Sequence, residues 1–347
     1  MFLEQIGADA RVRELFQTRA TAETELARVS FAAQEQYRIL LESAECEAAP
    51  AGKLRWADVL PAVGDWVIAQ RVDSTLAWIE KVLPRRTQFS RKAAGRVGIE
   101  QVMAANIDGA VIVCGLDGDF NLRRIERYLV LTRESGAEPV IVLNKADLCD
   151  CINARLDQVS RIAGGAHVVV LSAVESVAPV AEVVQGRTIA LFGSSGAGKS
   201  TITNGLLGTA RQATASVRPA DSRGRHTTTS RMLIPLPGGG AIIDTPGMRE
   251  LQLWASEEAL DEAFNEIAEL AQRCRFGDCT HASEPGCAVR EGVESGAIER
   301  SRWESYGKLQ RELRHHAVEQ DAQARSAEKK RWKAIHKSLR NHPKYRS

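Results

Sequence analysis

The stretch that decides the fold is Gly193-Ser194-Ser195-Gly196-Ala197-Gly198-Lys199-Ser200. It matches the pattern G-x-x-x-x-G-K-[ST], and it stands between an apolar run at 189–192 and a segment that can form a helix. Glycines let consecutive backbone N–H groups turn toward a phosphate, while the lysine neutralises phosphate oxygens and the Ser200 hydroxyl can ligate Mg²⁺. We therefore predict a phosphate-binding loop, and we assign this stretch and the following Thr201 to nucleotide binding.

A second motif, Asn144-Lys145-Ala146-Asp147, follows the apolar run 140–143 and indicates which base is bound. A carboxylate at Asp147 can accept both the N1–H and the exocyclic amino group of guanine, a donor pair that adenine does not offer. Asn144 can contact the ring edge while Lys145 lies along it. Ser172-Ala173, after the run 167–171, suits a backbone N–H contact to the guanine O6. Together these segments predict GTP and GDP rather than ATP as ligands.

A third motif, Asp244-Thr245-Pro246-Gly247, follows the apolar run 241–243. An aspartate at the end of a strand can hold Mg²⁺ through its water shell. The N–H of Gly247 can contact the γ-phosphate and so sense whether that group is present. The motif is short, but its occurrence in the same chain as a phosphate-binding loop indicates a nucleotide hydrolase.

The segment Arg223-Gly224-Arg225-His226-Thr227-Thr228-Thr229 occupies the expected position of the first switch. One of its threonines should ligate Mg²⁺ in the GTP state; we favour Thr228, although spacing does not choose among the three. Met248 stands where many GTPases place a glutamine that orients water, so His226 is the best-placed group for that task. The alternative is that His226 only caps or packs the switch.

The order of these motifs is unusual, because the base-recognition segments precede the phosphate-binding loop. One sheet can still hold them all if the chain is circularly permuted. Apolar runs alternate with helical stretches such as 122–134, which predicts an α/β domain with a mostly parallel sheet covered on both faces. The predicted strands are 110–114, 140–143, 167–171, 188–192 and 241–243.

The N-terminal part has a different pattern, with short runs rich in Val, Tyr, Trp and Ile separated by turn residues. We predict a small β-barrel of OB type, which serves nucleic-acid binding or is merely an interaction surface. Residues 1–25 are predicted to be a variable extension, and the basic residues 84–105 a solvated connector. The predicted barrel strands are 26–31, 37–41, 54–56, 66–69 and 76–82.

A cluster of potential metal ligands, Cys274-x4-Cys279-x-His281-x5-Cys287, lies near the C-terminus. Three thiolates and one imidazole complete a tetrahedral Zn²⁺ shell, so the predicted site is structural. The alternative, unpaired core cysteines, fits poorly with so polar a segment. The region should be mainly helical, with Ser256 capping an amphipathic helix at 257–273. The remaining cysteines are expected to be buried or incidental thiols, namely Cys46, Cys114, Cys149 and Cys151.

Composition and charge narrow the class of protein further. The 347 residues are 44% hydrophobic and 26% charged, which excludes collagen, coiled-coil and wholly disordered chains. No apolar run reaches the roughly 18 residues that span a bilayer, and no signal segment is evident, so we expect a cytoplasmic protein with reduced cysteines. The net charge is +2, yet residues 321–347 carry nine Lys or Arg against two acidic residues. Such a tail favours RNA as partner, although a solvated charged helix has the same composition.

The motifs, in this order, resemble the RsgA (YjeQ) family of circularly permuted GTPases. Further matches are Pro61-Ala62-Val63-Gly64-Asp65-Trp66-Val67, Asn106 and Asp117-Gly118-Asp119-Phe120. The resemblance implies an OB-type barrel, a permuted GTPase domain and a mainly helical zinc-binding domain. We expect an extension at 1–25 and domains at 26–95, 96–255 and 256–347, the last ending in the basic tail.

The resemblance also implies a function. Family members bind the small ribosomal subunit late in 30S maturation, hydrolyse GTP to GDP and phosphate with stimulation by that subunit, and contact 16S rRNA. The family histidine that maps onto His226 replaces the missing glutamine. We accordingly expect GTP or GDP, Mg²⁺ and one structural Zn²⁺ as cofactors, and a monomer without a membrane or DNA partner. The alternative is a permuted GTPase, or a GTP-dependent RNA-binding switch, that acts on another ribosomal particle.

Overall fold

The structure is a computed structural model that describes residues 2–33, 36–56, 60–92, 100–209, 231–244 and 255–315. Its central feature is a parallel sheet in the strand order β10-β9-β8-β11-β13. This confirms the predicted mostly parallel sheet. All five strands end at one edge, which therefore collects the loops that follow them. The strands are β8 (Gly109–Gly115), β9 (Glu138–Asn144), β10 (His167–Val170), β11 (Thr188–Phe192) and β13 (Ala241–Asp244).

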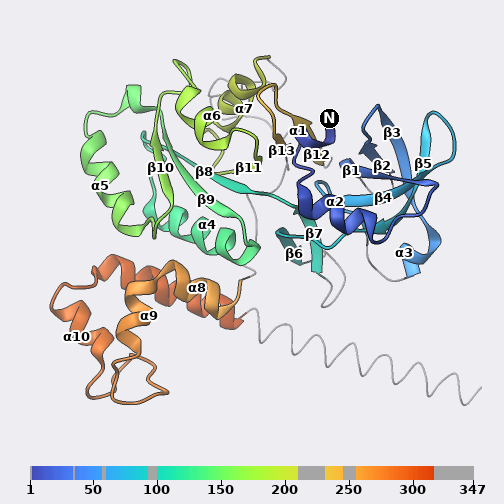
Figure 1. The fold of residues 1–347 in the computed structure, drawn as a ribbon. Coiled ribbons are helices and arrows are strands. Elements are labelled where there is room, and N and C mark those ends of the chain that lie inside the picture. The colour runs from blue at the N-terminus through green and yellow to red at the C-terminus, as the bar shows by residue number, and fades with distance from the viewer. Residues whose placement is uncertain are drawn as a thin grey trace, which may run out of the picture.

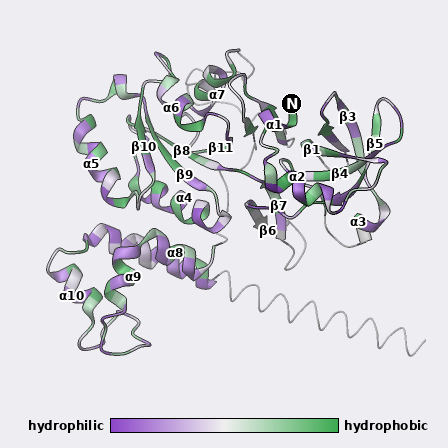
Figure 2. Ribbon diagram, viewed as in Figure 1, coloured by the Kyte–Doolittle hydropathy of each residue, from purple (hydrophilic) through white to green (hydrophobic). Residues whose placement is uncertain are grey.

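Helices cover both faces of this sheet (Figure 1). Alternate residues of β8 face opposite sides: Ile112 belongs to the core under α4 and α5, whereas Val111 and Val113 belong to the core under α6 and α7. Hydrophobic and hydrophilic residues alternate along these helices (Figure 2), as in any helix that buries one side. The helices are α4 (Leu122–Ser135), α5 (Ile152–Ile162), α6 (Ala178–Val184) and α7 (Lys199–Leu207).

The N-terminal strands close into a five-stranded barrel of OB type, as predicted. They pair in the order β1-β2-β3-β5-β4, and β4 pairs back with β1. Its interior is filled by fully buried aliphatic side chains, including Val29, Ile39 and Ile79. The strands are β1 (Thr24–Ala33), β2 (Gln36–Leu40), β3 (Glu45–Pro50), β4 (Trp66–Arg71) and β5 (Leu76–Val82).

Two predictions about this part are wrong. Residues 54–56 belong to helix α3 (Gly52–Trp56), and the third strand is β3, in which the buried Cys46 and Ala48 alternate with the exposed Glu45 and Glu47. Because the buried side chains of β3 are small, their alternation with polar residues gave only a weak hydrophobic pattern in the sequence. The predicted connector 84–105 contains β6 (Gln88–Lys92) and β7 (Glu100–Ala105), which pair with each other and bury Phe89 and Met103.

The barrel and the parallel sheet are continuous through one strand. β12 (Arg231–Pro235) pairs antiparallel with β13 on one side and with β1 on the other, where Phe31 lies opposite Met232. The buried guanidinium of Arg28 strengthens this junction, since it donates to Thr188 Oγ1 (2.9 Å) and to the Asn106 carbonyl (3.0 Å). The short helices α1 (Phe2–Gln5) and α2 (Ala10–Gln17) pack at the same place.

The C-terminal part is helical, as predicted, and packs against α4 (Figure 1). It contains α8 (Glu257–Ala263), α9 (Asn265–Ala271), α10 (Ala288–Glu294) and helical residues 300–315. Ser256 caps α8, as expected, by accepting a hydrogen bond from the Ala259 N–H (3.2 Å). The predicted single helix at 257–273 breaks at Phe264, whose buried ring packs under Arg302 at 4.1 Å. Among the described residues, no helix has the length and apolarity required to cross a membrane.

Candidate active site

Three of the predicted motifs meet at the carboxyl edge of the parallel sheet, and Asn144 joins them. This side chain, only 3% exposed, ends β9. Its Nδ2 donates to the Ala197 carbonyl of the phosphate-binding loop (2.8 Å), and its Oδ1 accepts from the N–H of Ala173 (2.9 Å). The two base-recognition segments and the phosphate-binding loop are therefore neighbours in space, although the loop comes last in the chain.

The phosphate-binding loop adopts backbone conformations that favour glycine. Gly193 and Gly198 have positive φ values of 139° and 99°. A Cβ at Gly193 would overlap the Val113 carbonyl oxygen, and one at Gly198 would overlap the amide nitrogen of Asn144. Lys199 begins α7, and its Nζ donates to the carbonyls of Gly193 (2.8 Å) and Ser194 (2.5 Å). The ammonium thus lies within the loop, where it can neutralise phosphate oxygens.

The guanine-recognition segment is a tight turn fixed to its neighbours. Lys145 has a positive φ of 64°, and a 3₁₀ turn, η1 (Ala146–Leu148), carries the exposed Asp147. The Ala146 N–H donates to the Leu171 carbonyl (3.2 Å), just before Ser172. The turn therefore holds Asp147 beside the segment predicted to contact the guanine O6.

Two carboxylates to which the sequence motifs assign no role lie in the loop after β8. Asp117 forms an ion pair with Lys145 (2.6 Å), and Asp119 accepts a hydrogen bond from the Ser194 hydroxyl. Burial acts to raise the pKa of Asp117, but the hydrogen bond and charge of Lys145, together with the hydrogen bond from the Asp119 N–H, outweigh it, so this pKa lies below its usual value. Asp119 also pairs with Arg124 (2.9 Å). Their place after a parallel strand was the signal that could have identified them.

The remaining predicted catalytic residues divide into two groups. Asp244 ends β13 at the same edge and is half-buried. His226, Thr228 and Gly247 lie outside the described residues, as does the basic tail 321–347. Their roles in positioning water, ligating Mg²⁺ and sensing the γ-phosphate therefore stay predictions.

The four predicted metal ligands converge in the C-terminal part. The ligand atoms of Cys274, Cys279, His281 and Cys287 all lie within 4.8 Å of one another. Cys274 Sγ is 3.9 Å from Cys287 Sγ, and His281 Nδ1 is 3.5 and 3.4 Å from these two sulfurs. Tetrahedral zinc, with Zn–S near 2.3 Å and Zn–N near 2.0 Å, separates its ligand atoms by about 3.5 to 3.8 Å. The donor set and its spacing therefore fit Zn²⁺, which would bind there without an open coordination position.

Hydrogen bonds within the loop position these ligands. Glu284 accepts from the N–H groups of Thr280, Ala282 and Ser283, each at 3.0 Å. Its bond from the Thr280 hydroxyl and these backbone bonds lower the pKa of Glu284 to about 2. The His281 ring meets the Trp303 ring edge-on at 6.0 Å. The metal-binding loop is thus attached to helical residues 300–315 by an aromatic contact.

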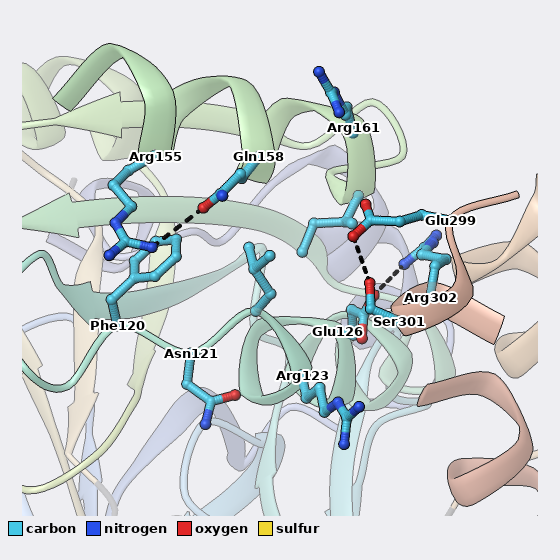
Figure 3. Close-up of a pocket in the computed structure, with 12 residues that line it drawn as sticks. Phe120, Asn121, Arg123, Glu126, Arg155, Gln158, Arg161, Glu299, Ser301 and Arg302 are labelled. Atoms are coloured by element: carbon cyan, nitrogen blue, oxygen red, sulfur yellow. Dashed lines mark hydrogen bonds and ion pairs between the residues drawn. The ribbon is translucent and has the colours of Figure 1, made fainter. Parts of the chain in front are cut away.

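Buried charges attach this C-terminal part to the sheet domain. Arg302 donates to Glu126 of α4 at 2.9 Å (Figure 3) and to Glu266 of α9 at 2.5 Å, and it is 6% exposed. Beside this pair lies a pocket of about 510 Å³ with arginine-rich walls, to which Arg155 and Arg161 of α5 contribute. Arg155 stacks on Phe120 at 4.4 Å.

The chain is similar to proteins of one family over nearly its whole length. Residues 82–254 match the model of the RsgA GTPase family. A protein of Opitutus terrae named "Small ribosomal subunit biogenesis GTPase RsgA" is 46% identical, over 98% of this chain and 97% of that protein. One of the same name from Syntrophotalea carbinolica is 41% identical, over 96% of each.

Solved structures agree with these likenesses. YjeQ from Thermotoga maritima has a TM-score of 0.65 and 28% identity, over 84% of this chain and 98% of that one. YloQ, described as a circularly permuted GTPase, has the same fold, with a TM-score of 0.62 and 24% identity over 86% of this chain and 98% of that one. The relatives and the convergence of the motifs show together that this chain belongs to the RsgA family of circularly permuted GTPases.

Proposed function

We propose that this GTPase acts in late maturation of the small ribosomal subunit, that the subunit stimulates its hydrolysis of GTP to GDP and phosphate, and that it binds 16S rRNA. The observation that carries the nucleotide part is the pair of hydrogen bonds made by Asn144, because they unite the three motifs in one site. The ribosomal part is supported by the names of relatives that are similar over almost the entire chain.

In this proposal each segment has one task. The exposed carboxylate of Asp147 selects guanine, and a backbone N–H of the Ser172-Ala173 segment contacts its O6. The backbone N–H groups of residues 193–198 and the Lys199 ammonium bind the phosphates. Ser200 at the first turn of α7 and Asp244 at the end of β13 fit Mg²⁺, since both offer oxygen donors at one edge of adjacent strands. When bound, Mg²⁺ neutralises charge on the β- and γ-phosphates.

Hydrolysis then depends on the two switch segments. His226 would orient the attacking water and Thr228 would ligate Mg²⁺ in the GTP state. The N–H of Gly247 would sense the γ-phosphate. Since β12 and β13 lie between these two segments in the chain and β12 also pairs with β1, a change at the switches can reach the barrel through the sheet.

One pocket of the structure and one segment of the sequence support an RNA partner. The first is the arginine-rich pocket between α4, α5 and residues 299–302, where Arg155 stacks on Phe120 and Arg161 adds a second cationic group to the wall (Figure 3). The second is the basic tail 321–347. We propose that the barrel and the zinc-binding part also contact 16S rRNA, that the protein acts as a monomer, and that it works in the cytoplasm, where ribosomes mature.

The decisive experiment is a GTPase assay with purified 30S subunits, with 50S subunits and without either. We expect 30S subunits, but not 50S subunits, to stimulate GTP hydrolysis. GDP should compete with GTP for the site, and ATP should not. Lys199→Ala should abolish nucleotide-dependent 30S binding, whereas His226→Ala should keep GTP affinity and lose most of the stimulated turnover. Stimulation by 50S instead would favour action on another ribosomal particle, and slow hydrolysis that no particle accelerates would favour a binding switch.

A further inference from the structure

Two cysteines that seemed incidental in the sequence form an accessible pair. The sulfurs of Cys149 and Cys151 are 3.9 Å apart, and Cys149 is half-buried whereas Cys151 is exposed, so of the two expectations, buried or incidental, burial does not hold for Cys151. The chain's other cysteines differ. Cys46 and Cys114 are buried, and burial raises the pKa of both thiols, while the remaining three belong to the metal cluster.

The pair lies directly beside the residue proposed to select guanine. Cys149 ends the 3₁₀ turn that carries Asp147, and its N–H donates to the Ala146 carbonyl (3.2 Å). Cys151 is the N-cap residue of α5. A covalent bond between the two sulfurs would therefore tie the guanine-recognition turn to the start of α5.

A second path leads from Cys151 to the nucleotide loops. The Cys151 carbonyl accepts from the N–H of Arg155 (3.2 Å), and the Arg155 guanidinium lies over the Phe120 ring (Figure 3). Phe120 follows Asp119 directly, and Asp119 holds the Ser194 hydroxyl of the phosphate-binding loop. A shift at the start of α5 can thus reach both halves of the nucleotide site.

We propose that Cys149 and Cys151 are a modification site, a dithiol that hydrogen peroxide oxidises to a disulfide, and that the disulfide weakens guanine-nucleotide binding. The proposal rests on the role of Asp147 in the proposed function. The Cys151 thiolate attacks one peroxide oxygen and the O–O bond breaks, giving a sulfenic acid and hydroxide, which takes the thiol proton to become water. The Cys149 thiolate then attacks that sulfur, an S–S bond forms and the S–O bond breaks, and the leaving hydroxide takes up the proton that the Cys149 thiol released and departs as a second water. The two sulfurs lose two electrons in total, and peroxide gains them.

The geometry explains the effect on binding. A disulfide holds its sulfurs about 2.05 Å apart, so Cys149 and Cys151 must approach by roughly 1.9 Å. The bond joins residues only two positions apart, and the turn that ends at Cys149 must adjust. An exposed disulfide of this kind is easily reduced, so the modification is reversible by cellular thiols.

The test uses the full-length, zinc-loaded protein with hydrogen peroxide as the probe. Mass spectrometry maps the disulfide, a fluorescent GDP analogue reports affinity, and a chromogenic chelator reports zinc that stays bound. We expect a Cys149–Cys151 disulfide with zinc retained, and affinity lowered about fivefold or more, with full recovery in dithiothreitol. Cys151→Ser should bind GDP like the parent and ignore peroxide, whereas Cys46→Ser should respond like the parent.

The outcomes separate this inference from the function on which it rests. A reduced protein that binds no guanine nucleotide would overturn the proposed function and the coupling with it. Normal binding in the reduced state with unchanged affinity in the mapped disulfide form would overturn the coupling alone. If peroxide does not link these two cysteines, or if the Cys151→Ser variant loses as much GDP affinity after peroxide as the parent, the proposed modification site is wrong.

Discussion

The proposed nucleotide site and the proposed metal site are held together in opposite ways. The nucleotide site collects loops from strands that span residues 109–244, and buried sheet packing fixes them before any ligand binds. The metal site lies within residues 274–287, of which only Cys287 is buried. The difference predicts that the first site is a product of the fold, whereas a bound ion would supply much of the order of the second.

The strongest test of this contrast is removal of the metal. Cys274→Ser, or a chelator, should release about one zinc ion per chain and make residues 274–287 protease-sensitive, because structural zinc contributes on the order of 10 kcal/mol. GDP affinity should change less than about twofold, since the four metal ligands lie within residues 274–287, outside the loops that follow the parallel strands. Cys151→Ser is the control, an exposed cysteine outside the cluster. Equal loss of zinc and nucleotide binding would mean that the two sites are not independent.

A second test asks what holds the C-terminal part to the sheet when zinc is present. Glu126→Gln leaves the buried Arg302 with one carboxylate partner fewer and should lower the stability of the interface by about 2 kcal/mol, measured by hydrogen exchange. Glu304→Gln is matched, because its partner Arg123 also lies on α4 but the pair is exposed, and it should cost less than about 0.5 kcal/mol. Equal effects of the two substitutions would show that burial does not govern this interface.

Sequence patterns predicted the parallel sheet well, because each strand is a short continuous apolar run. The predicted strand at 188–192 coincides with β11, and the predicted helix at 122–134 ends one residue before α4 does. The metal ligands were found by spacing alone, since all lie within one short segment. Local patterns of this kind need no knowledge of tertiary structure.

Features set by distant contacts were not predicted. The pairing of β12 with β1 joins residues about 200 positions apart, and no local pattern encodes it. The break at Phe264 follows from its burial under Arg302, a contact that the helical periodicity of 257–273 does not reveal. The contact of Asp119 with Ser194 was not predicted either, because the two residues are close in space and far apart in the sequence.

The glycine at the end of the phosphate-binding loop gives a third test. Gly198→Ala should lower GDP affinity about tenfold, because the new Cβ would displace Asn144, which joins the three motifs. Gly208→Ala is the control: its φ of 64° is also left-handed, but nothing lies within 4 Å of the added Cβ. It should cost about 1 kcal/mol of stability and leave nucleotide affinity unchanged, as titration calorimetry can measure. Similar GDP affinities for both variants would show that nucleotide binding does not depend on the position of Asn144.

The smallest expected effect concerns the acidic loop after β8. Asp119→Asn keeps the size of the side chain but removes the charge that holds the Ser194 hydroxyl and Arg124, so GDP affinity should fall about threefold. Asp117→Asn is matched in chemistry but frees Lys145 on the base side of the site. We expect each carboxylate to serve the half of the site that it contacts. Asp119→Asn should then weaken the binding of GDP and GTP but not that of guanosine, which lacks phosphates. Asp117→Asn should alter the binding of guanosine as well. Indistinguishable profiles for the two variants would show that the loop acts as one unit.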